Sequence, residues 1–193
     1  DSDGALIFLV YPLDIVSPAM AKQIVDITIE KITGPIGIRR YNGDSYWCKD
    51  YKDKTGADAT KAFTDEEMKE RDKLVVNGEE AQWCIFDPIM SCVYGKWYQE
   101  SKNPEMLKLQ QKFFCRSLAQ VTGDGEGFGP WLCPESYYLC KGEWVPSDIC
   151  PLLWTQANLA VALHHMEESV TMSATAKRPA SAAGGVQKKP ARR

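Results

Sequence analysis

The segment from Arg40 to Trp47 combines fixed charges with aromatic rings. Arg40 and Asp44 supply hydrogen-bond donors and acceptors, and Tyr46 and Trp47 supply flat apolar faces. A sugar ring has apolar C–H faces and a rim of hydroxyl groups, so this combination suits carbohydrate binding. A loop that folds on its own aromatic rings, with an internal Arg–Asp pair, explains the same residues equally well.

A single carboxylate lies among aromatic residues after the glycine-rich stretch at 123–130. Glu135 follows Pro134 and precedes Tyr137 and Tyr138. We expect this side chain to be partly removed from water, which would raise its pKa and suit general acid or base chemistry. An exposed acid at a turn is the alternative, and the motif taken alone favours that alternative.

A third cluster opens a predicted helix near residue 151. Trp154, Gln156 and Asn158 combine a stacking surface with amide groups. A buried tryptophan accompanied by polar capping residues is the other interpretation. The sequence therefore offers three clusters that could bind a polar, ring-shaped ligand together, provided that the fold brings them to one place.

The cysteines and histidines do not predict a metal site. None of the seven cysteines forms a CxxC pair, so the spacing typical of zinc ligands is missing. His164 and His165 are adjacent, and adjacent side chains point in different directions from a helix. We expect a reduced protein without a metal or cofactor, in which Cys84, Cys92 and Cys115 act as small apolar residues of helices.

Apolar periodicity predicts the helices that position these clusters. The expected helices begin at Ser17-Pro18, Glu79, Asn103-Pro104 and Pro151, and the second places Glu79 and Glu80 in its first turn. Asp87 in that helix is expected to be a capping or hydrogen-bonded residue. Thr64 would cap a short charged helix, and the segment 137–145 would form a hairpin. The expected fold class is all-α, with antiparallel α-hairpins, long loops on one face and a small β-hairpin.

Composition and charge restrict the classes of function. The 193 residues are 44% hydrophobic and 25% charged, as in a soluble globular protein, and the sequence contains no apolar run long enough for a transmembrane helix. Residues 171–193 carry six basic side chains and no acid, which leaves 17 basic against 26 acidic side chains in residues 1–170. An acidic body argues against nucleic-acid binding. We expect residues 1–170 to fold and 171–193 to be a disordered basic tail.

Taken in order, the three clusters resemble glycoside hydrolase family fifteen. The motifs are R-Y-x-G-D-x-Y-W from Arg40 to Trp47, P-E-x-Y-Y from Pro134 to Tyr138, and P-L-L-W-T-Q-A from Pro151 onwards. The nearest branch is that of the phosphorylase b kinase regulatory (alpha/beta) subunits, whose amino-terminal domain is similar to glucoamylases. The resemblance covers about residues 5–169.

The resemblance implies that residues 1–170 are the C-terminal part of a six-hairpin, (α/α)6 toroid with a sugar site at its loop-rich end. It implies that Arg40 and Asp44 bind the innermost glucose and that Glu135 is the general base of an inverting hydrolase. The general acid would then lie before the first residue of this sequence. The predicted substrate-binding residues are Arg40, Asp44, Tyr46, Trp47 and Trp154.

Three functions are consistent with these observations. The first is a regulatory-subunit-like protein of glycogen metabolism that binds α-glucan without turnover. For this function the resemblance implies a cytoplasmic location, peripheral membrane association, and kinase catalytic and calmodulin-type partners. The second is an inverting, exo-acting α-glucan hydrolase. The third is a non-catalytic scaffold.

Overall fold

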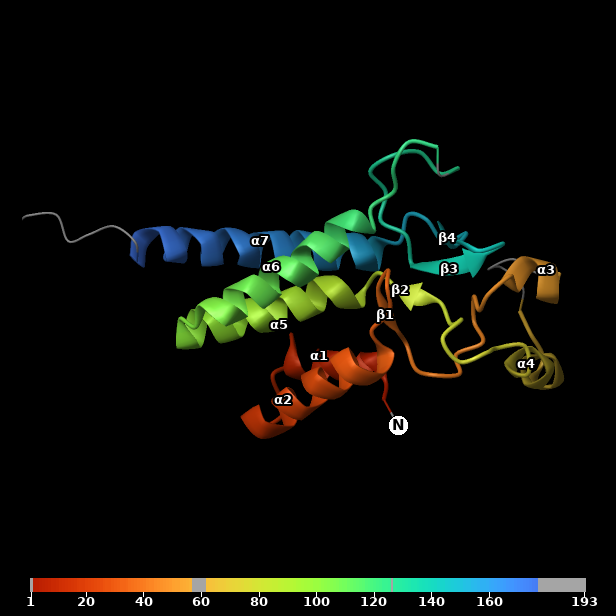
Figure 1. Cartoon of the computed structure of the whole chain (residues 1–193), viewed down its shortest axis with the longest axis horizontal. Helices are drawn as coiled ribbons and strands as arrows, with labels where there is room; N and C mark the ends of the chain where they lie inside the picture. The colour runs from red at the N-terminus through yellow and green to blue at the C-terminus, as the bar shows by residue number, and fades with distance from the viewer. Residues whose placement is uncertain (1, 57–61, 126, 177–193) are drawn as a thin grey trace, which may run out of the picture.

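The computed structural model describes residues 2–56, 62–125 and 127–176, and it is rich in helix. Figure 1 shows α5, α6 and α7 side by side, with α1 and α2 beneath them and a small sheet at the other end near α3 and α4. The helices are η1 (Gly4–Leu6), α1 (Ile7–Val10), α2 (Pro18–Ile27) with a π-helical continuation (Thr28–Ile32), α3 (Tyr51–Thr55), α4 (Asp65–Asp72), α5 (Phe86–Ser101), α6 (Pro104–Ala119) and α7 (Leu153–Ala176). The strands are β1 (Ile38–Arg39), β2 (Gln82–Trp83), β3 (Ser136–Cys140) and β4 (Glu143–Pro146).

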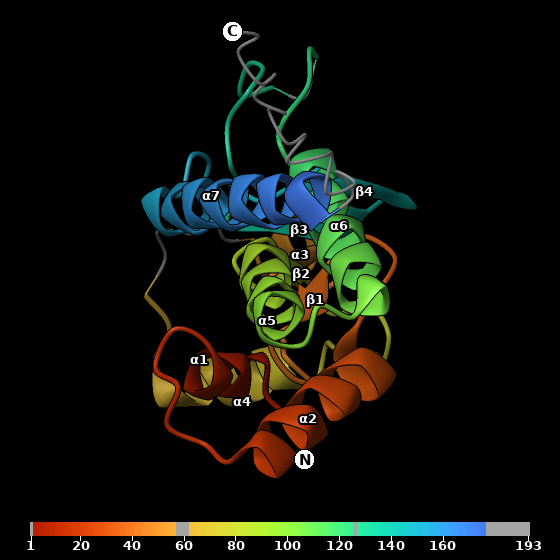
Figure 2. The same cartoon turned by 90° about the vertical axis from the view of Figure 1, so that its left-hand side faces the viewer.

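Local capping residues begin several of these helices as the sequence predicts. The Ser17 hydroxyl accepts a hydrogen bond from the Met20 amide at the start of α2, and Asn103 does the same for Glu105 in α6. Thr64 and Glu67 form a complete capping box at α4. The short link between α5 and α6 makes them antiparallel neighbours, and the view along the helices shows α7 lying across both (Figure 2).

The strands form one antiparallel sheet in the order β1-β2-β3-β4, which is larger than the predicted hairpin. Trp83 of β2 is opposite Ile38 of β1 and Ser136 of β3. The predicted hairpin is present as β3 and β4, with Tyr138 opposite Val145. This sheet joins the loop after β1 to the strand that follows Glu135, so it brings the first two clusters together.

Two apolar clusters stabilise the fold. The larger lies between α1, α2, α5 and α6 and includes Ile7, Val25, Met90 and Phe113. The smaller lies under the sheet and α3, and it is formed by Trp47, Cys48, Tyr51, Ala81 and Tyr138. The partly buried Tyr46 packs against both clusters, so the two cores are connected.

The second predicted helix begins later than expected. The segment 79–85 is not helical: it contains β2, and α5 starts at Phe86. The Gln82 side chain explains the difference, because its Oε1 accepts hydrogen bonds from the Ile36 and Gly37 amides at 2.7 Å each. These long-range bonds and the pairing of β2 outweigh the helical periodicity of the aromatic residues.

Two further predictions differ from the structure: the boundary between the folded part and the basic tail, and the environment of the cysteines. α7 continues past residue 170 to Ala176, and the remainder of the predicted basic tail lies outside the described residues. Cys84 and Cys92 are buried as predicted, but Cys84 lies in the turn between β2 and α5 and not in a helix. Cys115 is exposed on α6. Burial raises the pKa of the Cys92 thiol to about 12, so that group stays protonated.

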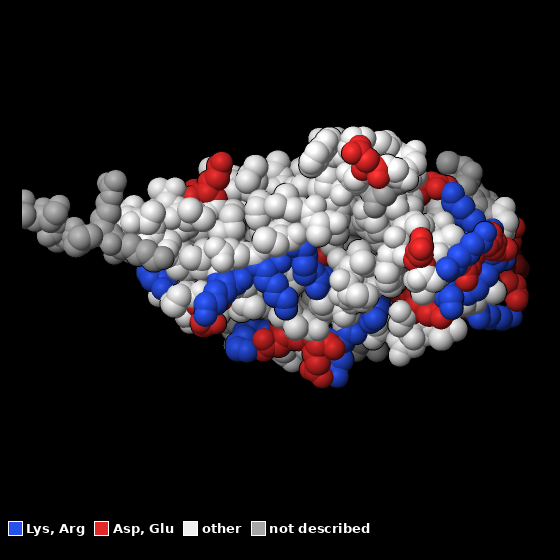
Figure 3. Space-filling model, turned by 45° about the horizontal axis from the view of Figure 1, so that its top comes forward, with Lys and Arg blue, Asp and Glu red and all other residues white. Residues whose placement is uncertain are grey.

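The outer face of α7 carries few charges. The inner face of α7 carries its buried residues, which include Thr155, Asn158 and Ala162. The Asn158 side-chain amide donates to the Ile85 carbonyl at 3.0 Å. Figure 3 shows that the surface over α7 is largely free of charged side chains, whereas charges of both signs gather over α3 and α4. None of the helices in the described part of the chain is long and apolar enough to span a membrane.

Gln110 provides a direct test of packing between α5 and α6. It is fully buried against Gly95, and neither polar atom of its side-chain amide has a hydrogen-bond partner among the described residues. Because an unsatisfied buried amide is costly, we expect Gln110→Met to raise the free energy of unfolding by about 1 kcal/mol in urea denaturation. Gln110→Ala should lower it by leaving a cavity. A less stable Gln110→Met variant would contradict this assignment.

Asp87 predicts a pH dependence of stability. Its buried carboxylate lies 3.1 Å from the Arg116 Nε atom and accepts a hydrogen bond from Gln120, as expected for a hydrogen-bonded residue. Burial raises its pKa from 3.8 to about 6, although Arg116 and Gln120 act in the opposite direction. Between pH 6 and pH 4 the folded protein therefore binds a proton that the unfolded chain does not, so this contribution stabilises the fold as pH falls.

The measurement compares the wild type with Asp87→Asn, whose side chain does not titrate. As pH is lowered from 7 to 4, the wild type should gain about 2 kcal/mol of unfolding free energy relative to Asp87→Asn. A relative loss of stability on acidification would mean that the Asp87–Arg116 pair lowers the carboxyl pKa instead.

Candidate functional site

The Arg40–Asp44 pair is the centre of the candidate site. The Arg40 Nε and Nη2 atoms donate to the two carboxylate oxygens of Asp44 at 2.8 and 2.7 Å. The Asp44 side chain is buried, and its Oδ1 also accepts a hydrogen bond from the Tyr46 amide at 3.1 Å. Paired bonds of this kind fix both the position and the plane of the guanidinium group.

Aromatic rings surround the Arg40 guanidinium. Its central carbon lies 4.7 Å from the ring centroid of Trp83, 5.3 Å from that of Tyr41 and 5.6 Å from that of Tyr46. Trp83 is buried, whereas Tyr41 is 40% exposed and about a third of the Arg40 side chain is exposed. The surface available to a ligand therefore consists of a fixed cation beside tyrosine rings.

A buried acid holds the turn that carries Asp44. The Glu80 carboxylate accepts hydrogen bonds from the Gly43 amide at 2.8 Å and the Gly78 amide at 2.7 Å, and it lies 3.4 Å from the Arg39 Nε atom. Glu80 is therefore not in the first turn of a helix, as the periodicity suggests, but between two loops. Gly43 has a φ of +85°, a conformation that glycine adopts without strain.

Glu135 lies within electrostatic reach of this pair. It is partly buried, and burial raises the pKa of its carboxyl to about 6, against the lowering effect of Arg40 and with a further increase from Asp44. The charge of Glu135 in turn helps to raise the Tyr46 pKa, after the larger effect of burial. Two backbone bonds fix the segment, from Cys84 N to Glu135 O and from Glu135 N to Ile149 O, both at 2.9 Å.

Trp47 does not line this site. Its side chain is fully buried in the smaller core, with ring centroids 4.9 Å from both Tyr51 and Tyr138. Its backbone has a φ of +54°, in the left-handed region. A ligand cannot reach a ring that has no exposed surface, so the structure corrects the prediction that Trp47 binds substrate.

Trp154 lies at the start of α7, next to Phe8 and not against the Arg40–Asp44 pair. The two ring centroids are 5.4 Å apart, and Trp154 is 53% exposed. The Leu152 amide donates to the Cys133 carbonyl at 2.7 Å, which places the start of α7 beside the segment leading to Glu135. Arg40, Asp44, Tyr46 and Glu135 thus gather in one place, and Trp154 lies on a neighbouring segment.

Sequence reasoning missed three residues around the site. Trp83 lies beneath Arg40 in β2, although a helix that begins at Glu79 would include it. Tyr41 contacts Arg40 but is not among the predicted binding residues, and Glu80 lies outside the helix that the periodicity predicts. Tyr41 follows Arg40 directly in the sequence, and this adjacency could have identified it as a residue of the site. The position of Glu80 depends on two distant glycine amides and has no local signal.

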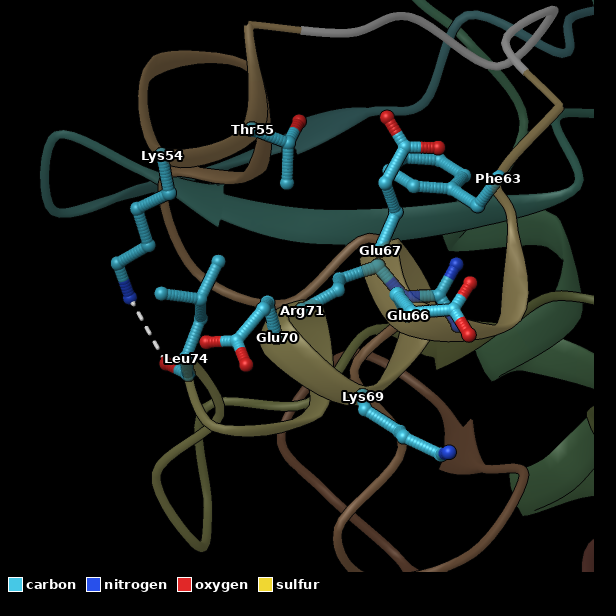
Figure 4. Close-up of a pocket in the computed structure, with 9 residues that line it drawn as sticks. All are labelled: Lys54, Thr55, Phe63, Glu66, Glu67, Lys69, Glu70, Arg71 and Leu74. Atoms are coloured by element: carbon cyan, nitrogen blue, oxygen red, sulfur yellow. Dashed lines mark hydrogen bonds between the residues drawn. The ribbon is translucent and has the colours of Figure 1, made fainter.

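A separate hollow of about 520 Å³ lies between α3 and α4 (Figure 4). Its lining mixes both charges with apolar groups: Lys54, Thr55, Phe63, Glu66, Glu67, Lys69, Glu70, Arg71 and Leu74. Arg71 stacks over Phe63 at 5.0 Å and donates to the Ser45 hydroxyl at 2.9 Å. The hollow contains none of the predicted site residues. α4 contacts the loop that carries Arg40 and Asp44 (the site loop, residues 40–47) through Ser45.

The described residues contain no group of three or more side chains that could hold a metal ion. Comparison with known proteins assigns the chain to no family: no protein-family model matches it, and no curated protein is significantly similar to it.

Proposed function

We propose that this chain is part of a protein like the phosphorylase b kinase regulatory subunits, and that it binds α-glucan without turning it over. In this proposal its helices are the C-terminal part of an (α/α)6 toroid, and kinase catalytic and calmodulin-type subunits are its partners. The observation that carries the proposal is the fixed Arg40–Asp44 pair beside partly exposed tyrosines and Glu135.

These groups suit a sugar because they offer both kinds of contact that a sugar needs. Charged donors and acceptors can pair with hydroxyl groups, and a tyrosine ring can cover a C–H face. Asp44 is unsuited to proton transfer, since both its oxygens already accept hydrogen bonds. Inverting hydrolysis needs two carboxyl groups, and among the described residues Glu135 is the candidate for one of them.

Calorimetric titration with maltose, combined with a glucose-release assay, tests this proposal. We expect saturable maltose binding and no release of glucose from maltooligosaccharides. Absence of binding at millimolar maltose would favour the scaffold function. Co-purification of the longer protein with a kinase catalytic chain would support the regulatory assignment, and a longer protein that purifies alone would contradict it.

A glucoamylase-like hydrolase is the second candidate, and the raised pKa of Glu135 favours it. A carboxyl with a pKa of about 6 is matched to general-base chemistry near neutral pH. Glucose release that is lost in Glu135→Gln, while maltose binding remains, would establish this function. In that case the general acid would have to come from outside the described residues.

A further inference from the structure

Trp131 has an unusually exposed ring. Its side chain is 84% exposed, more than any other large hydrophobic residue in the described part of the chain. Its neighbours Gly127, Gly129 and Pro130 provide little apolar surface for it to pack against. The ring therefore contributes little to the stability of the fold, because it buries little area.

The backbone beneath this exposed ring is nevertheless held firmly. The Trp131 amide donates to the Thr122 carbonyl at 2.8 Å, and the Thr122 amide donates to the Leu132 carbonyl at 2.8 Å. The Thr122 hydroxyl also donates to Gly129 O at 2.7 Å and accepts from Leu132 N at 2.9 Å. These bonds maintain a left-handed φ of +68° at Trp131, which is rare for a residue with a side chain.

The same short segment carries Glu135. Three residues lie between Trp131 and Glu135, so their Cα atoms are at most about 14 Å apart. The segment is fixed between them by the bond from Leu152 N to Cys133 O, and at Glu135 by its bonds to Cys84 and Ile149. A fixed aromatic platform therefore lies within a few sugar units of the candidate site.

We propose that Trp131 is an outer stacking platform that binds the continuation of an α-glucan chain beyond the sugars held near Arg40 and Glu135. This role rests on the proposed function and extends it from a short sugar to a polymer. A rigidly held ring loses little conformational freedom when a sugar stacks on it.

The test compares maltose with maltoheptaose by calorimetry on the full chain. We expect Trp131→Ala to weaken maltoheptaose binding about tenfold and to change maltose affinity less than about twofold. Trp131→Phe should retain most of the affinity, because it keeps a stacking ring. Leu118→Ala is the control for loss of an exposed apolar side chain of α6, and thermal melting should show that all three variants remain folded.

The outcomes separate this inference from the proposed function. Unchanged maltoheptaose binding in Trp131→Ala, with normal maltose binding, would overturn the role of Trp131 and leave the inner site standing. Maltoheptaose binding that depends on Trp131, without any maltose binding, would support the platform and contradict the inner site. A wild-type protein that binds neither maltose nor maltoheptaose would overturn the proposed function and the role of Trp131 together. Dissociation of an oligomer by Trp131→Ala would identify a protein contact instead and also overturn the platform.

Discussion

Trp47→Ala is expected to lower the free energy of unfolding by about 3–5 kcal/mol, the range typical of removing a large, fully buried aromatic side chain. Trp47 fills the centre of the smaller core between Tyr51 and Tyr138, and the Lys52 ammonium lies 5.7 Å from its ring centroid. Removing the ring would leave a cavity beneath the sheet and α3. Urea denaturation measures the change directly.

The matched comparison is Trp154→Ala, which removes the same side chain from a half-exposed position and should cost much less stability. Trp47→Phe should recover part of the lost stability and keep maltose affinity, because it restores apolar volume away from the site. A Trp47→Ala protein of normal stability that fails to bind maltose would show instead that this ring contacts the sugar.

Asp44→Ala is expected to reduce maltose affinity by about a hundredfold or more. Loss of the carboxylate removes an acceptor that would bind the sugar, and it leaves the partly buried Arg40 guanidinium without the partner that fixes its position and plane. The Tyr46 amide loses an acceptor in the same change, so the site loop loses two of its fixed points. Calorimetric titration with maltose gives the affinity.

Asp44→Asn and Glu66→Ala serve as controls for this experiment. The first preserves the shape of the side chain but not its charge, so it should bind maltose with intermediate affinity. The second removes an exposed acid of α4 and should leave the affinity unchanged. Equal maltose affinity in Asp44→Ala and the wild type would remove Asp44 from the site.

The parts of this fold that the sequence predicts depend on local interactions. The caps at Ser17, Thr64 and Asn103 involve side chains and amides two or three residues apart, so composition and spacing identify them. The late start of α5 depends on Gln82 bonding to a loop 45 residues away, which no local pattern records. Long-range hydrogen bonds therefore mark the limit of the prediction.

The candidate site divides in the same way. Arg40 and Asp44 are four residues apart in one motif, so their pairing is a local interaction that the sequence indicates. The partial burial of Glu135 is one of the two alternatives that its neighbours allow, and the motif taken alone favours the other. The inward position of Trp47 follows from its left-handed backbone conformation and from packing against Tyr138. That conformation is set by the tertiary structure, so the local sequence around Trp47 does not predict it.

The titration of the Glu135 carboxyl carbon by NMR, with and without maltose, tests the site most directly. In the free protein the midpoint should be near 6, because burial outweighs the effect of Arg40. Saturating maltose should lower the midpoint, since sugar hydroxyl groups would donate hydrogen bonds to the charged form. A midpoint near 4.5, the ordinary value for glutamate, that does not respond to maltose would contradict a sugar site at Arg40, Asp44 and Glu135.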